Sequence, residues 1–167
     1  GQFYSRRFVM TYPNEQLPAG RPLKMAPAHS DMTAAGAVWG HSWDLEVPLY
    51  FAPQGFAETP SLKRSNAFDI VGGECRAVRE NVGLLDITGF SRFEVSGPNA
   101  EAWLNSVFAT KLPAPGRARL AVALGHDGRL KGDLTLFNWG DGTWWIMGSY
   151  YLRRWHMRWF DDHMQDG

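Results

Sequence analysis

The sequence has little of what marks several classes of protein. Its single cysteine, Cys75, excludes an internal disulfide and a thiol-based zinc site. Its 17 basic residues balance 17 acidic ones, so no net field attracts nucleic acid or an anionic membrane. No apolar run approaches the ~20 residues that span a bilayer, and no signal-peptide core is present. We expect a cytoplasmic or mitochondrial-matrix location and small polar partners, with no nucleic acid and no membrane.

Motifs for nucleotides and metals are also missing. Neither a GxGxxG nor a GxxxxGK sequence occurs, so a dinucleotide-binding fold does not lie in these residues. His156 and His163 are seven residues apart, whereas helical metal pairs usually sit four apart, which predicts surface roles and no metal. Cys75 follows two glycines and an acid without an identifiable base, which favours a small buried apolar side chain over a nucleophile.

The prolines divide the chain into two parts. Residues 1–60 hold seven of the ten prolines, each of which removes a backbone donor and opposes a helix. We expect short strands and extended loops here that do not form a domain alone. One helix is predicted over residues 30–37, with Ser30 or Asp31 as its N-cap.

Regular patterns begin at residue 66 and predict an α+β fold, with helices flanking an antiparallel sheet. The apolar spacing favours helices over 68–81, after Pro98 and over 150–164, where Leu152, Trp155, Trp159 and His163 would share a face. Alternation and turn residues predict strands over 84–88, 92–96, 119–124, 133–138 and 143–147, the last three as a meander.

Three segments resemble a known family. GLLDITGFSRFEVSGPNAEAWLN, GHDGRLKGDLTLFN and the helix after Gly148 look like the start of the aminomethyltransferase domain of glycine-cleavage T proteins. The version fused to flavin-dependent dimethylglycine and sarcosine dehydrogenases is the most similar. Upstream, NEQLPAGRPLKMAPAHSDMTAAGAVWG and LEVPLYFAPQG resemble the segment that links the flavin and folate parts of those enzymes. Plain T proteins lack that segment, so the dehydrogenase branch is favoured.

The resemblance implies a domain organisation and a function. Residues 1–60 would be a linking segment like the central domain of FAD-dependent amine dehydrogenases, and residues 61–167 the N-terminal part of a T-protein-like folate-binding domain. The chain would then be an internal fragment, with the flavin domain before it and the rest of the folate domain after it. The parent would oxidise an N-methyl amine with FAD and pass the one-carbon unit to tetrahydrofolate. The partners implied are that amine and the rest of the same polypeptide.

The same resemblance implies the site residues. Asp133 stands at the acidic position that T proteins use to orient and deprotonate a tetrahydrofolate nitrogen, and Thr135, Ser149 and Leu120 stand at cofactor-binding positions. A partly desolvated carboxylate between Gly132 and an apolar strand is a competent proton acceptor. The alternative is a carboxylate that accepts backbone donors at the start of a strand or caps a turn.

Four residues depart from the family pattern. Leu120 replaces a tyrosine, Gly125 and Ser149 replace asparagines, and Gly132 replaces a second acid. These departures leave open the alternative of a non-catalytic relative that serves regulation or assembly. The presence of Asp133 argues against that alternative. A plain aminomethyltransferase that acts on a lipoyl carrier protein is disfavoured by residues 17–56.

The N-terminal part has two further candidate groups. Arg21 and Lys24 in GRPLKMAP could form a cationic loop for a carboxylate or a flavin phosphate, or could anchor the linker through hydrogen bonds. The aromatic residues could line a methylammonium pocket through cation–π contacts, or could pack between domains. They are Trp39, Trp43, Tyr50 and Phe51.

Overall fold

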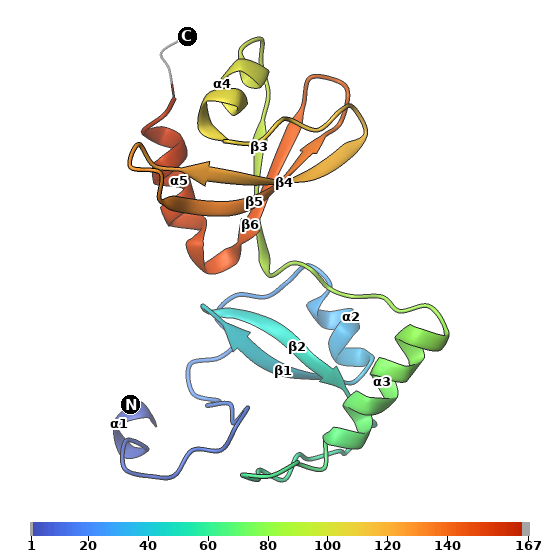
Figure 1. Ribbon diagram of the computed structural model, residues 1–167. Helices are drawn as coiled ribbons and strands as arrows, with labels where there is room; N and C mark the ends of the chain where they lie inside the picture. The colour runs from blue at the N-terminus through green and yellow to red at the C-terminus, as the bar shows by residue number, and fades with distance from the viewer. Residues whose placement is uncertain (1, 165–167) are drawn as a thin grey trace. The chain divides into compact units, whose positions relative to one another are not determined.

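The structure, a computed structural model, describes residues 2–164 and divides into two compact units at Ile87 and Thr88 (Figure 1). Each unit has its own apolar cluster. This division by compactness differs from the boundary at residues 60 and 61, which separates a linking segment from a folate-binding domain. That boundary stays a prediction.

The first unit is built around a β-hairpin. Strands β1 (Ala37–Ser42) and β2 (Leu45–Phe51) pair antiparallel, and Pro48 sits beside a bulge, where a missing backbone donor is tolerated. Helices α1 (Gln2–Ser5), α2 (His29–Ala34) and α3 (Phe68–Glu80) complete the unit. A small core of Tyr50, Ala52 and Ala67 joins the hairpin to α3.

The second unit is an antiparallel sheet with two helices. Its strands follow the order β3-β6-β5-β4, so the predicted meander is confirmed and β3 adds to its β6 edge. The elements are β3 (Phe90–Val95), α4 (Ala100–Val107), β4 (Arg117–Leu124), β5 (Leu130–Asn138), β6 (Trp144–Ser149), the 3-10 turn η1 (Tyr150–Leu152) and α5 (Arg153–Asp161).

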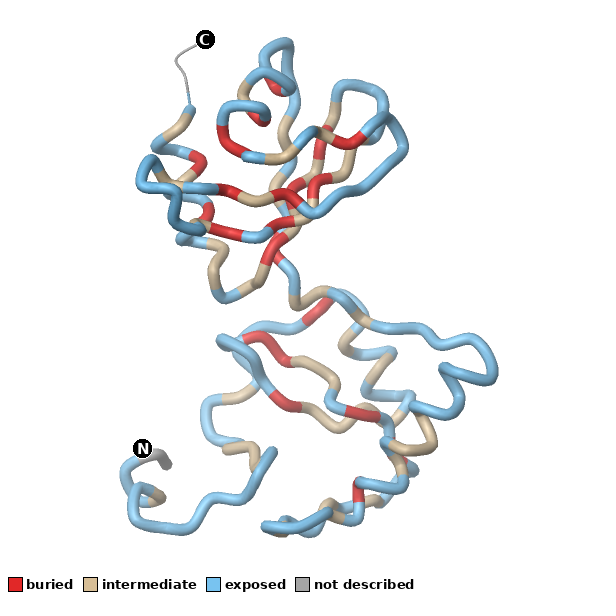
Figure 2. Tube along the Cα trace, in the orientation of Figure 1, coloured by how far each residue is buried: buried red, intermediate tan, exposed pale blue. Residues whose placement is uncertain are grey.

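The core of this unit lies on one face of the sheet. Leu134, Leu136 and Ile146 are fully buried, and each such side chain contributes roughly 1.5–3 kcal/mol by leaving water. Phe160 of α5 packs edge-on against Phe93 at 5.1 Å between ring centroids. Buried and less buried positions alternate along β5 and β6, so the other face remains accessible (Figure 2).

Several expected elements differ from the structure. The strand expected over residues 84–88 is wrong: residues 84–87 are extended but belong to neither of the described sheets, and Thr88 lies in a turn. The helix expected over 30–37 is α2, which begins at His29 without a side-chain cap and ends before β1. The expected helix over 150–164 begins with the 3-10 turn, and α5 buries His156 and Phe160 rather than the predicted face.

Candidate functional site

The four candidate site residues share the sheet face that is turned away from α4 and α5. Thr135 of β5 lies opposite Leu120 of β4 and opposite Met147 of β6. Asp133 lies two residues before Thr135 on β5, and Ser149 lies two residues after Met147 on β6. Positions two apart on a strand face the same way. The sheet therefore gathers Asp133, Thr135, Ser149 and Leu120 on one face, whereas their roles there stay predictions.

Asp133 lies inside β5 and not at its start. The strand begins at Leu130, and Asp133 pairs with Val122 of β4. Its side chain is exposed and accepts no hydrogen bond from the described residues 2–164. The expected partial desolvation is therefore not found in this chain, and neither is the alternative of a carboxylate that caps a turn or a strand start.

Apolar side chains lie near Asp133 on the same face of the sheet. Phe90 is 48% and Leu120 60% exposed, and Met147 is half-buried. Trp145 lies farther along this face, opposite Phe137 and four strand positions from the level of Asp133, where it donates through Nε1 to Glu94 Oε2 at 3.2 Å. A flat polar ring laid on such a surface would meet apolar contacts and one unengaged carboxylate.

His156 was not predicted as part of this region, and its expected surface role is wrong. The side chain is 3% exposed on α5, and neither ring nitrogen has a partner among the described residues. Each buried unpaired polar atom costs about 1–3 kcal/mol. Burial lowers the pKa of His156, and the charge of Asp133 opposes that shift. The i, i+4 pairing of His156 with Phe160 was the available sequence signal.

Two glycines make room for the His156 ring. A Cβ at Gly132 would lie 2.9 Å from Nε2, and one at Gly148 would meet the Leu134 side chain first and lie 3.2 Å from Nδ1. The imidazole therefore packs directly on the backbones of β5 and β6, on the face opposite Asp133 and Ser149. The acid that many family members carry at the position of Gly132 would point into this space.

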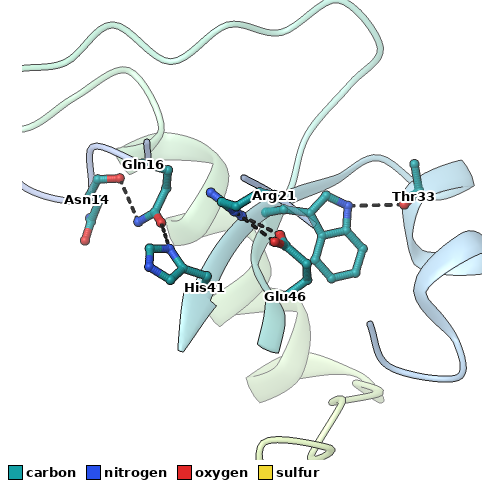
Figure 3. Close-up of polar contacts among 7 residues, drawn as sticks. Asn14, Gln16, Arg21, Thr33, His41 and Glu46 are labelled. Carbon is teal, nitrogen blue, oxygen red and sulfur yellow. Dashed lines mark hydrogen bonds and ion pairs between the residues drawn. The ribbon is translucent and has the colours of Figure 1, made fainter. Parts of the chain in front are cut away.

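In the first unit, Arg21 is occupied by an internal partner. Its guanidinium donates from Nε to Glu46 Oε1 at 2.8 Å, and its Nη2 bonds Glu46 Oε2 (Figure 3). Glu46 is 3% exposed, and the hydrogen bond from Arg21 lowers the pKa of that carboxyl. The arrangement supports the anchoring alternative for this loop. Nearby, His41 and Gln16 lie in hydrogen-bond contact at 3.0 Å.

The four N-terminal aromatic residues do not form one pocket. Trp43 lies at the tip of the hairpin and Phe51 at its open end, about 20 Å along the strands. Tyr50 is buried and donates to Glu58 at 2.7 Å, and desolvation raises the pKa of its hydroxyl. Trp39 stacks on His29 at 4.2 Å between ring centroids, and its indole nitrogen donates to Thr33 Oγ1 at 3.1 Å.

The structure also bears on Cys75, on metal binding and on membrane-spanning helices. Cys75 is exposed on α3, so the expected burial is wrong, because that helix buries none of its residues fully. Within residues 2–164, no three His, Cys, Asp or Glu side chains come together as a metal site would require. The described helices include none that is both long and apolar enough to cross a membrane.

The chain is similar to several curated proteins. Mitochondrial dimethylglycine dehydrogenase of Mus musculus is 25% identical over 161 residues, 95% of this chain and 18% of that protein. The formaldehyde-forming 4-methylaminobutanoate oxidase of Paenarthrobacter nicotinovorans is 36% identical over 97 residues, 57% of this chain and 12% of that protein. The mitochondrial pyruvate dehydrogenase phosphatase regulatory subunit of Mus musculus is 28% identical over 115 residues, 65% of this chain and 13% of that protein.

The fold and the family follow from two further matches. The crystal structure of glycine cleavage system aminomethyltransferase T from Bartonella henselae aligns with a TM-score of 0.64 and 19% identity, covering 84% of this chain and 35% of that one. The chain spans less than a fifth of the dimethylglycine dehydrogenases it matches. The model of the GCVT N-terminal domain matches residues 28–167. The chain therefore belongs to the GCVT family, as a fragment that resembles its dimethylglycine and sarcosine dehydrogenase branch.

Proposed function

We propose that this chain supplies the start of a folate-binding domain in a flavin-dependent N-methyl amine dehydrogenase. The open sheet face carries the proposal, because it joins Asp133 to Thr135, Ser149 and an apolar surface around Leu120. The similarity to dimethylglycine dehydrogenases over most of the chain supports the same assignment.

The residues on this face fit a pterin ring. Phe90, Leu120 and Met147 offer apolar contact to its flat surface, and the hydroxyls of Thr135 and Ser149 can donate to or accept from its polar edge. Tetrahydrofolate supplies the nitrogen that takes up the one-carbon unit. FAD, bound outside these residues, supplies the oxidation of the N-methyl group.

Asp133 would act as the base in this scheme. The accepting nitrogen must lose a proton as its bond to the one-carbon unit forms, and a carboxylate within hydrogen-bond reach can take it. Asp133 is suited to the task because no described residue occupies its oxygens. Desolvation of that carboxylate would come from the bound ring itself.

The Asp133→Asn variant of the intact protein tests this role. Amine oxidation at the flavin should be unchanged, while the share of carbon recovered as methylenetetrahydrofolate should fall by ~10² on the scale of general-base catalysis, with formaldehyde released instead. Glu101→Gln, on α4, is the matched control for loss of one carboxylate. Unchanged carbon capture in Asp133→Asn would remove Asp133 from the role of base.

A second candidate function is a regulatory relative without folate chemistry. The similarity to a phosphatase regulatory subunit over 65% of the chain favours it, as do Leu120, Gly125 and Ser149 in place of the usual polar residues. This reading predicts that neither amine oxidation nor tetrahydrofolate binding is measurable in the intact protein.

A further inference from the structure

His156 occupies an unusual position for a polar side chain. It projects from α5 into the core of the second unit, and both of its ring nitrogens lack partners among the described residues. An apolar side chain of similar size would avoid that loss of hydrogen bonds with water. A polar group kept in such a place at a cost to stability marks a site where another requirement dominates.

The ring is wedged against the two strands that carry the candidate site. Gly132 and Gly148, whose missing Cβ atoms create its space, directly precede Asp133 and Ser149. Side chains of adjacent residues point to opposite faces of a strand. The ring therefore contacts the stretch of backbone from which Asp133 and Ser149 project on the other side.

The electrostatics connect the same groups. Burial lowers the pKa of His156, and the negative charge of Asp133, on the other face of the sheet, raises it by a smaller amount. β6 carries no charged residue. The other charged residues on the elements that hold or flank the ring are Lys131, Arg153, Arg154, Arg158 and Asp161.

We infer that His156 is a positioning residue of the candidate folate site, whose ring holds β5 and β6 at the spacing that Asp133 and Ser149 need. The inference rests on the proposed function for its consequence in folate binding. The contact of the ring with Gly132 and Gly148 stands independently of it.

A double-mutant cycle tests the contact. In the intact protein, Gly132→Ala should weaken tetrahydrofolate binding by about 10-fold, because small displacements of binding groups have large effects. His156→Ala alone should weaken binding several-fold, because the spacing of β5 and β6 is no longer held. In the Gly132→Ala background it should instead relieve the clash, so the double variant should bind at least several-fold better than Gly132→Ala alone. Gly89→Ala is the control, because nothing lies within 4 Å of the added Cβ. Additive effects of the two substitutions would overturn the inference.

A second measurement does not depend on folate. Histidine-selective NMR should show a lower pKa for His156 in Asp133→Asn than in the wild type, since the opposing carboxylate charge is gone, and no change in Glu94→Gln. The carboxyl ¹³C shift of Asp133 should move in Gly132→Ala and return in the double variant. If the wild type binds no tetrahydrofolate, the proposed function fails, and an unmoved Asp133 signal in Gly132→Ala would overturn the role of His156 as well.

Discussion

At the scale of single residues, Asp133 projects from one face of β5 into water, whereas the His156 ring of α5 packs on the other face and is buried. Asp133 keeps contact with water, so its charge costs little before a ligand arrives. His156 is buried, and its lowered pKa means that the neutral ring is the form that packs against the glycines. Protein stability should therefore fall with acid below the ordinary histidine pKa of about 6.5.

The buried ion pair of the first unit gives a prediction at the same scale. Glu46→Gln should destabilise the protein by about 3 kcal/mol, because it leaves the largely buried Arg21 without its counter-charge. Asp44→Asn, which removes the exposed partner of Lys24 at 4.0 Å, should cost under about 1 kcal/mol. Equal losses in urea denaturation of the two variants would contradict the structural role of the pair.

The contribution of Glu46 to the free energy of unfolding depends on pH, and the sign of that dependence is defined. The pKa of Glu46 is lowered in the folded protein, so its contribution is complete above the unfolded value of about 4.3 and is lost as the pH falls through the folded value. The stability gap between wild type and Glu46→Gln should be constant near neutral pH and should shrink below about pH 4. Urea midpoints measured from pH 3 to 8 check it.

At residue scale, the residues of the open sheet face could be predicted from the sequence, but the burial of His156 on the opposite face could not. The alternation around Asp133 suffices to place Thr135 on the same face. The burial of His156 depends on Gly132 and Gly148, two glycines that are distant in sequence and adjacent only after the sheet forms. No local pattern contains that information.

At the scale of elements, the hairpin between β1 and β2 turns through two residues with positive φ. Trp43 has φ of 50° and Asp44 of 72°, a conformation that favours glycine at the second position. Asp44→Gly should therefore stabilise the protein by about 0.5–1 kcal/mol. Ser42→Gly, on the adjacent strand, should destabilise it by a similar amount. Thermal unfolding distinguishes the two, and a loss of stability in both would contradict the turn geometry.

The elements that sequence predicted well are those with a strong local period. The strands of the meander and α3 fall within two or three residues of the expected bounds, because alternation and helical spacing are local properties. The face of α5 was missed because its first turn is η1, with fewer residues per turn, which rotates every later side chain. Residues 84–88 have the composition of a strand, but neither of the described sheets includes them.

At the scale of the whole chain, a large amount of apolar surface is accessible. Leu84 and Leu85 are largely exposed in the extended segment, and Phe90 and Leu120 are exposed on the sheet. A polypeptide limited to residues 1–167 should therefore bind a hydrophobic dye and associate at micromolar concentration. Leu120→Asn should reduce the dye signal, and a monomer that binds no dye would contradict this expectation.

Binding of tetrahydrofolate by the sheet face around Asp133 is the step on which the proposed function depends. Its most direct measurement is calorimetric titration of tetrahydrofolate into the intact protein, the Asp133→Asn variant and the Glu94→Gln variant, which removes another carboxylate from the same face. Saturable binding is expected for the wild type and for Glu94→Gln, and binding weakened by about 10-fold or more in Asp133→Asn, as for loss of a hydrogen bond to a charged group. Absence of binding by the wild type, or equal affinity in Asp133→Asn, would contradict the proposed function.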